Sequence, residues 1–572
     1  MWENICVPKL GFPKVRDEAW ECSAALASYY ALPRAVDKVG DALDLPIKKD
    51  MEGKMAMMQL AKPKPDGSFE ISPDKFTTLF SYCVDDVRAE REISRRLPAL
   101  SPYERRVWLL DQKINRRGVP LDRAVIDGAI KIIDQYTKVL EEEMAKMTDG
   151  KLNNIRQTAA LQAWLGDNGV FVDNVQKGTI EEVLSRTNIK PSVRRVLEIR
   201  QALGQTSTAK YYALRNYCDV DNTAKDQFMY CGASTLRFSG KGAQWQNFPR
   251  GSVTPTEEMF EAIKSGSWRQ VQVFGDVMDV LSSCLRGVAA APDGFVFYDS
   301  DFANIEGRIA AWVTGEHWKV QAFRDFDAGT GADLYMLAYA KTFGIPVEEV
   351  TKDNRQIGKV LELSMQYGGS VGAFTKMASA YGVSLPDDEV LAMVKMWRAA
   401  HPNIVGAWRD IEDAAMKAVA TGREIRVNDR VSFVMEDEFL VCRTIAGSAM
   451  HYYKPAISEV ETQWGKRNAL TFMGVNSVSR KFERQDTYGG KLFENIVQHL
   501  ARVVLTDTML DLDEAGFDIR LHIHDQIVAL VPENDPKLTV ELYESLMVKP
   551  KEWAKDLPLA AEGEMLKRFK KG

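Results

Sequence analysis

Two carboxylates in this sequence stand where apolar runs give way to polar residues. Asp301 follows the apolar and aromatic run Phe295-Val-Phe-Tyr, which predicts a short buried strand. From Asn304 onward the apolar residues recur at helical spacing, so we expect Asp301 where a strand turns into a helix. A carboxylate at the edge of a core is costly unless a cation or hydrogen bonds compensate it. Capping of the following helix would also account for Asp301.

The second carboxylate lies within residues 519–532, which form two apolar runs broken by the polar tip His524-Asp525-Gln526. This pattern predicts a hairpin and puts Asp525 at another strand edge. Asp301 and Asp525 could then converge on a pair of divalent ions, an arrangement that serves in-line displacement at phosphorus.

Between the two carboxylates, four side chains recur at intervals of four residues: Arg355, Lys359, Leu363 and Tyr367. On a helix these positions share one face. Two cations, an apolar residue and an aromatic residue in a row suit phosphates, then a sugar, then a base. The spacing therefore indicates a nucleotide site.

The elements that position these residues belong to a chain of 572 residues, enough for about four domains. The 45% hydrophobic and 27% charged content is ordinary for a globular protein, and no apolar run is long enough to cross a membrane. The net charge of −6 does not exclude a nucleic-acid partner, because a basic groove can coexist with an acidic remainder. Seven scattered cysteines without a Cys-x-x-Cys pair argue against a zinc site or a disulfide framework and predict a reducing, cytoplasmic location.

The stretches around Asp301, Lys359 and Asp525 resemble the three polymerase motifs of family A DNA polymerases, the relatives of bacterial DNA polymerase I, and those of phages above all. A fourth stretch, residues 235–250, matches without a gap the family pattern Thr-Gly-Arg-Leu-Ser-Ser, a short variable segment and Gln-Asn-Ile-Pro. The four motifs occur in the family's order, and the resemblance runs over nearly the whole chain.

This resemblance implies an α/β (α+β) fold shaped like a right hand, preceded by a remnant of a ribonuclease H-like exonuclease domain. The implied domains are a partial 3′–5′ exonuclease-like domain at 1–100, the thumb at 101–230, the first part of the palm at 231–325, the fingers at 326–485 and the second part of the palm at 486–572.

The implied reaction is template-directed addition of deoxynucleotides to a primer 3′-hydroxyl in phage genome replication, with primer-template DNA and deoxynucleoside triphosphates as partners. Two Mg²⁺ ions would be held by Asp301, Asp525 and the backbone carbonyl of Phe302. Lys359 would be catalytic together with the two aspartates, because it could protonate the leaving pyrophosphate. The resemblance assigns nucleotide binding to Arg355, Lys359, Leu363, Tyr367 and Glu306, and DNA binding to Arg237, Gln246, Asn247, Gln498 and His524.

The sequence departs from the family pattern at three places, of which Gln526 and Leu363 would touch the active site. Gln526 stands where the family usually has the glutamate of His-Asp-Glu, so we expect Gln526→Glu to be tolerated. Leu363 stands where cellular members carry an aromatic residue against the incoming sugar. Residues 444–448 read Thr-Ile-Ala-Gly-Ser in place of the family's Leu-Pro-Ser-Gly-Arg.

Two other functions stay open. A single-subunit RNA polymerase would share the fold and both aspartates. Glu306 argues against it, because in DNA-making members this residue fills the space that a ribose 2′-hydroxyl would need. A catalytically dead DNA-binding or replisome-scaffold protein would have no reason to keep three costly polar groups, Asp301, Lys359 and Asp525, at these positions.

The first hundred residues predict a chain that does not proofread. Tyr82-Cys-Val-Asp-Asp86 fits the last motif of the family's exonuclease domain, Tyr-x-x-x-Asp, but the Asp-x-Glu strand would have to lie upstream of Met1. A two-metal exonuclease fails when most of its carboxylates are absent. Either a separate polypeptide supplies the rest of that domain, or the chain is a truncation. Alternatively, residues 1–100 serve only as packing for the thumb.

Overall fold

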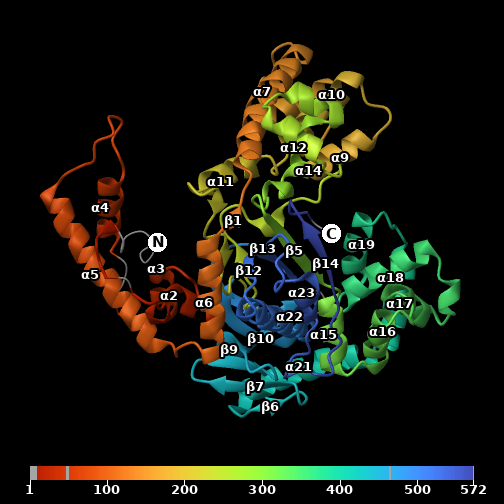
Figure 1. The fold of residues 1–572 in the computed structure, drawn as a ribbon. Coiled ribbons are helices and arrows are strands. Elements are labelled where there is room, and N and C mark those ends of the chain that lie inside the picture. Colours follow the sequence, from red (N-terminus) through yellow and green to blue (C-terminus); the bar gives the residue numbers. More distant parts are fainter. Residues whose placement is uncertain (1–8, 14, 47–49, 463–464, 571–572) are drawn as a thin grey trace.

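The computed structural model describes residues 9–13, 15–46, 50–462 and 465–570, and it has the outline of a half-open hand (Figure 1). A small sheet lies at the centre. A tower of helices rises above it, a second helical lobe lies on one side, and the N-terminal helices lie on the other. A larger sheet lies below.

The central sheet consists of four strands in the order β12-β13-β5-β14, and each neighbouring pair is antiparallel. The predicted strand at 295 and the predicted hairpin at 519–532 are both present. Strand β5 is buried on both faces up to Ser300, which explains why its sequence does not alternate. The strands are β5 (Phe295–Phe302), β12 (Asp518–Ile523), β13 (Gln526–Pro532) and β14 (Ala561–Leu566), and they pack with α15 (Ile305–Thr314), α22 (Gly489–Glu514) and α23 (Val540–Met547).

The tower is organised by its longest helix, α7 (Arg123–Met147), whose N-cap is Asp122. Asp122 Oδ1 accepts a hydrogen bond from the Val125 amide at 3.2 Å. Gly128 lets the chain near Ile263 pass close to α7, since a Cβ at Gly128 would lie 2.1 Å from the Ile263 carbonyl oxygen. The other helices of the tower are α8 (Thr158–Asp167), α9 (Lys177–Ser185), α10 (Pro191–Leu203), α11 (Ala209–Tyr217), α12 (Glu257–Lys264), α13 (Trp268–Val271) and α14 (Val277–Cys284), whereas α6 (Pro102–Arg117) lies beside the central sheet, against β12 and α22.

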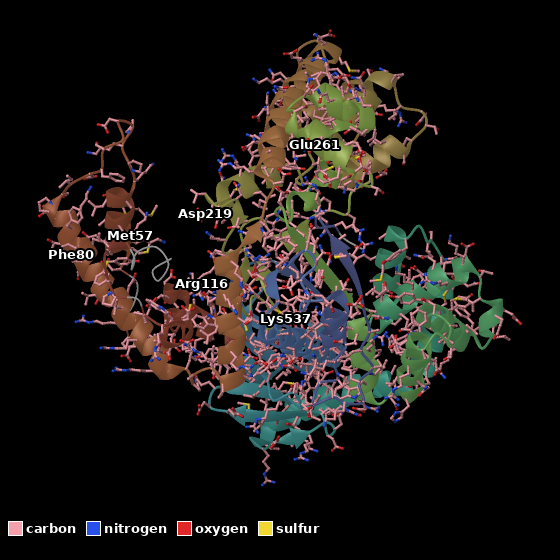
Figure 2. The ribbon with its side chains drawn as sticks, in the orientation of Figure 1. Met57, Phe80, Arg116, Asp219, Glu261 and Lys537 are labelled. Atoms are coloured by element: carbon pink, nitrogen blue, oxygen red, sulfur yellow. The ribbon has the colours of Figure 1, made fainter. Side chains whose placement is uncertain are left out.

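This packing adds a detail to the predicted domain boundaries, which stay predictions. Helices α12 and α14 belong to the segment predicted as palm, 231–325, yet they lie in the tower, where Glu261 marks α12 (Figure 2). The tower therefore draws on residues from both sides of position 230.

The side lobe contains six helices joined around a buried ion pair. Lys319 binds Glu362 in the interior, and Trp397 Nε1 donates a 2.8 Å hydrogen bond to the other Glu362 oxygen. Paired charges of this kind fix how helices meet, because either partner alone would be an uncompensated buried charge. The helices are α16 (His317–Asp327), α17 (Leu334–Phe343), α18 (Lys352–Met365), α19 (Val371–Ala380), α20 (Asp387–Ala400) and α21 (Pro402–Thr421).

The segment predicted as fingers, 326–485, also contains a six-stranded antiparallel sheet in the order β11-β10-β9-β8-β7-β6. It lies below the central sheet, beside α21 (Figure 1). Its strands are β6 (Ile425–Arg426), β7 (Val431–Glu436), β8 (Phe439–Thr444), β9 (Ala449–Thr462), β10 (Gly465–Val475) and β11 (Phe482–Asp486).

The described residues before 100 are helical and contain no strand. The Tyr82-x-x-x-Asp86 motif lies on a helix, where Tyr82 is buried against Gly53. This helix packs against the helix that contains Gly53, and the outer face of the pair carries exposed apolar side chains such as Phe80 (Figure 2). Its relation to an exonuclease stays a prediction. The helices are α2 (Ser23–Tyr29), α3 (Val36–Ala42), α4 (Met51–Ala61) and α5 (Pro73–Arg96).

One buried ion pair connects α6, beside the central sheet, to α22. Arg502 of α22 makes two hydrogen bonds, of 2.6 and 2.7 Å, to the carboxylate of Glu104 in α6, and both side chains are fully buried. The same carboxylate accepts hydrogen bonds from Tyr230 Oη at 2.7 Å and Ser448 Oγ at 2.8 Å. Four segments far apart in sequence therefore meet on one carboxylate whose oxygens are both satisfied. None of the helices in the described part of the chain has the length and apolar composition needed to cross a bilayer.

We predict that a second buried carboxyl, Asp111 of α6, makes stability fall as pH rises. Burial raises its pKa to about 7, with Gln112 and Arg34 opposing the shift, so the folded chain holds a proton that the unfolded chain has released. The stabilisation is complete below the unfolded pKa of about 4 and is lost as pH rises through about 7. Asp111→Asn should therefore raise the thermal midpoint at about pH 8 and change it little at about pH 4. The exposed Asp173→Asn is the control, and equal gains at both pH values would contradict the prediction.

Candidate active site

Asp301 and Asp525 lie side by side where β5 meets β13. Gln526 pairs with Asp301 in the antiparallel register, and the Phe302 amide donates a 3.2 Å hydrogen bond to the Asp525 carbonyl. The N-cap of α15 is Asn304, with no side-chain cap, so capping does not explain Asp301. The structure thus brings the two predicted carboxylates together.

The electrostatics of this pair fit a cation site. Burial raises the pKa of the Asp525 carboxyl, and the hydrogen-bonded Asp301 side chain, His524 and Arg237 work in the opposite direction. Two adjacent carboxyl groups repel each other when both are ionised, which a bound cation relieves. Among the described residues, no group of three or more His, Cys, Asp or Glu side chains is arranged to hold a metal ion. Two carboxylates and a carbonyl still suit Mg²⁺, which takes remaining ligands from water and substrate phosphates.

Glu306 links two other predicted residues on the first turn of α15. Its Oε1 lies 2.6 Å from Arg237 Nη2, and its Oε2 accepts a 2.7 Å hydrogen bond from Tyr367 Oη. Burial and the Glu306 carboxylate raise the pKa of the Tyr367 phenol far above its usual value, so the phenol stays a donor. The Tyr367 ring packs edge-on against Phe493 with ring centres 5.8 Å apart.

The predicted helical face is only partly right. Arg355, Lys359 and Leu363 lie on α18, but the helix ends at Met365, and Tyr367 follows it. Gly368 turns the chain with a φ of +84°, and at Gly369 a Cβ would lie 1.9 Å from the Ser364 carbonyl oxygen. Two glycines therefore end the helix in a tight turn that redirects Tyr367 toward Glu306.

The two cations of α18 have different partners. Arg355 makes two 3.0 Å hydrogen bonds to the carboxylate of Asp333, which balances the charge of the guanidinium. Lys359 Nζ lies 4.9 Å from the ring centre of Tyr381 and 5.8 Å from that of Tyr335. No ion pair in the described part of the chain includes Lys359. Leu363, one turn further on, is 41% exposed.

The predicted DNA-contacting residues are spread over several elements. Gln498 of α22 donates to Glu494 at 2.9 Å, and His524 is exposed at the hairpin tip with a φ of +57°. Gln246 and Asn247 lie on a short 3₁₀ turn, η3 (Trp245–Asn247). Asn247 lines a cavity of about 780 Å³ at the base of the tower together with residues such as Arg200 and Lys210, away from the hairpin tip.

Sequence reasoning missed Asp299, which is buried beside the carboxylate pair. Gln526 Nε2 donates to both Asp299 oxygens, at 2.8 and 3.0 Å. Burial raises the pKa of Asp299 to about 7, while Gln526 acts to lower it. The signal was the spacing Asp299-Ser300-Asp301, because alternate residues of a strand share a face. The tolerance of Gln526→Glu stays a prediction, and this contact argues against it, since a glutamate would face a second buried carboxyl.

Comparisons with known proteins place this geometry in a family. The family model described as DNA polymerase family A matches residues 125–469. A DNA polymerase of Bacillus phage SP02 is 35% identical over 585 residues, which span 100% of this chain and 88% of that protein. The chain belongs to DNA polymerase family A.

More distant similarities agree with this family A polymerase. A DNA polymerase of Bacillus phage SP01 is 26% identical over 378 residues, covering 61% of this chain and 37% of that protein. The POL domain of Pol1 from M. smegmatis has the same fold, with a TM-score of 0.56 at 17% identity over 95% of this chain and 81% of that one. The predicted mixed α/β fold and a DNA-directed DNA polymerase of phage type are therefore confirmed. The RNA polymerase and scaffold alternatives find no support.

We predict that Gln526→Glu slows extension by this polymerase by about tenfold or more, because like charges at a buried contact are costly. Adding Asp299→Asn should recover most of the rate, since the amide would then donate to the new glutamate. Single-turnover extension, with thermal midpoints to compare folding, measures both effects. A single variant with the wild-type rate, or a double variant no better than the single one, would contradict the prediction.

Proposed function

We propose that this polymerase extends a DNA primer on a template by two-metal phosphoryl transfer and replicates a phage genome in the cytoplasm of its host. The observation that supports the proposal most is the convergence of Asp301 and Asp525 at the end of the β5–β13 pair. Phage polymerases among the relatives support the role in replication.

Two Mg²⁺ ions would be held by Asp301, Asp525 and the backbone carbonyl of Phe302. When bound, they supply the positive charge that lowers the pKa of the primer 3′-hydroxyl and stabilises the reacting phosphate. The burial that raises the pKa of Asp525 makes this site depend on a cation for full ionisation.

Residues of α18 would hold the triphosphate. Lys359 has no carboxylate partner in the described part of the chain, and two aromatic rings keep its ammonium in place. It is therefore suited to bind the phosphates and to give a proton to the leaving pyrophosphate. Arg355 would exchange Asp333 for a phosphate, and Leu363 would face the sugar in place of the aromatic residue of cellular members.

Primer-template DNA would lie between the tower and the central sheet. The cavity that Asn247 shares with Arg200 and Lys210 supplies cations for the duplex backbone. Arg237, Gln246, Gln498 and His524 would contact the minor groove and the primer end. The M. smegmatis POL domain is described in complex with DNA primer-template and dNTP, which supports the same partners here. The proposal leaves out a separate exonuclease polypeptide, for which the comparisons give no support.

The two carboxylates give the first prediction of this proposal. Asp301→Ala or Asp525→Ala should lower the extension rate more than about a hundredfold while primer-template binding changes little, because the ions act on the reacting groups rather than on the duplex. Extension in Mg²⁺ and binding by fluorescence anisotropy measure the two quantities. The exposed Asp293→Ala, just before β5, is the matched control. Substantial extension by either variant would rule out this ligand assignment.

The contacts of Glu306 predict a steric gate against ribonucleotides. Glu306→Ala should raise the ratio of ribonucleotide to deoxynucleotide incorporation by about tenfold or more, because it opens the space for a 2′-hydroxyl. Tyr367→Phe removes only the 2.7 Å hydrogen bond to Glu306 and should give a smaller rise. Incorporation of each nucleotide by both variants tests this order. An unchanged ratio in Glu306→Ala would place the gate elsewhere.

A further inference from the structure

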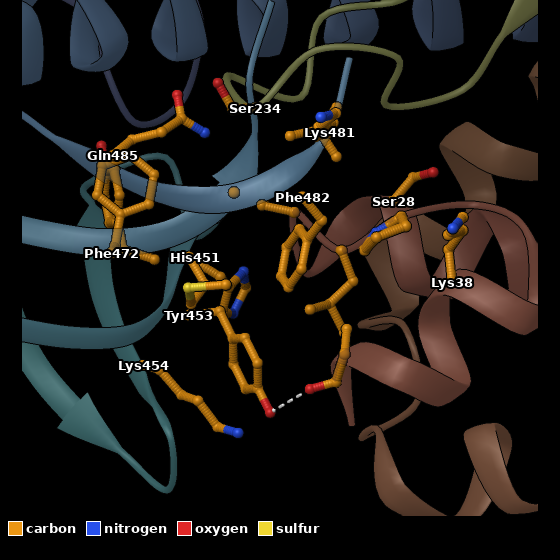
Figure 3. Close-up of a pocket in the computed structure, with 18 of the residues that line it drawn as sticks. Ser28, Lys38, Ser234, His451, Tyr453, Lys454, Phe472, Lys481, Phe482 and Gln485 are labelled. Carbon is orange, nitrogen blue, oxygen red and sulfur yellow. Dashed lines mark hydrogen bonds between the residues drawn. The ribbon is translucent and has the colours of Figure 1, made fainter. Parts of the chain in front are cut away.

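A cavity of about 1240 Å³ lies outside the site described above, between the N-terminal helices and the lower sheet (Figure 3). Helices α2 and α3 form one wall, strands β9–β11 form the other, and the first turns of α22 close it. Pockets for small molecules commonly hold about 300–1,000 Å³, so this space suits a longer ligand.

The cavity is basic although the chain as a whole is acidic. Of the described residues that line it, seven are lysines or arginines and three are aspartates, a local charge of +4. The whole sequence carries −6. Such a reversal of sign concentrates anions at one place on the molecule.

Most of these cations lack a carboxylate partner. Arg34 donates to Ser28 Oγ and to the Tyr230 carbonyl, and Arg484 donates to backbone and hydroxyl oxygens. No ion pair in the described part of the chain includes Lys38, Arg480 or Lys481. The remaining two lysines of the lining pair with Asp44 and Glu494. The charge is therefore available to a ligand from both walls.

Aromatic rings lie among these cations. Phe482 projects from β11 toward the helices, as Figure 3 shows, and Phe472 lies on the neighbouring strand. Both rings are partly exposed and line the cavity. Cations that follow a backbone combined with rings on which bases stack are the general means of binding single-stranded nucleic acid.

The cavity is continuous with elements of the polymerase site. Ser234 lines it, and the same loop reaches Arg237 three residues later. Lys491 also lines it from α22, about two turns before Gln498. A strand in the cavity would thus pass directly to Arg237 and Gln498, the residues proposed to contact the minor groove and the primer end.

We propose that this cavity binds single-stranded DNA, namely the unpaired template strand ahead of the active site, with its phosphates on Lys38, Arg480 and Lys481 and its bases against Phe482. The identity of the strand rests on the proposed function; the binding of single-stranded DNA does not. Through the cavity, the polymerase would bind template nucleotides that have not yet been copied.

The test compares primer-templates with template overhangs of about two and about 12 nucleotides, bound without nucleotides and followed by fluorescence anisotropy. Wild-type protein should bind the long overhang about tenfold or more tightly than the short one. The double variant Lys38→Glu/Lys481→Glu should abolish this advantage. For the long overhang, the slope of log affinity against log salt concentration should become shallower by about 1.4, because two phosphate contacts are lost. Binding and extension of the short-overhang substrate should not change. Phe482→Leu, which keeps every charge, should reduce the advantage without changing the slope.

Lys537→Glu/Lys555→Glu is the matched control. It changes the net charge equally at two exposed lysines outside the cavity lining, and it should keep the advantage. A cavity variant that retains the advantage, or a control variant that loses it, would overturn the proposal. If wild-type protein extended neither substrate, the proposed function would fail while the overhang result still decided the binding proposal.

Discussion

The site depends on the register between β5 and β13. Seven residue pairs join these strands, from Phe295 with Pro532 to Asp301 with Gln526. A slip of one residue would turn Asp301 to the other face of the sheet and separate it from Asp525. The register is secure because both strands are buried among apolar neighbours, so a slip would also expose core side chains and bury polar ones. The packing of the core therefore fixes the positions of Asp301 and Asp525 relative to each other.

Local patterns in the sequence were sufficient for the elements that hold the site. The strand before Asp301 and the hairpin around Asp525 each rest on a few adjacent residues, and both are present. Tyr367 lies outside the predicted helical face because equal spacing does not guarantee one continuous helix, and here the helix ends at Met365 before the turn at Gly368. The role of Asp299 could not be predicted, because it depends on a contact with Gln526 that only the strand register brings about.

Two buried ion pairs hold helices together in different parts of the molecule. Glu104 and Arg502 connect α6 to α22 beside the central sheet, and Lys319 and Glu362 connect α16 to α18 within the side lobe. Desolvation offsets much of the attraction in such pairs, so their net contribution to stability is small. Their effect is on specificity: other packings of these helices would strand a charge in the interior.

The carboxylate of Glu306 is shared between two parts of the chain, Arg237 before β5 and Tyr367 beyond the end of α18. A movement of α18 that draws Tyr367 away leaves Glu306 held by Arg237 alone. With Glu306 as the proposed steric gate, the shape that meets the incoming sugar would exist in one position of the side lobe and not in another. Discrimination between sugars would then depend on when the lobe is closed, because only that position would keep Tyr367 against Glu306.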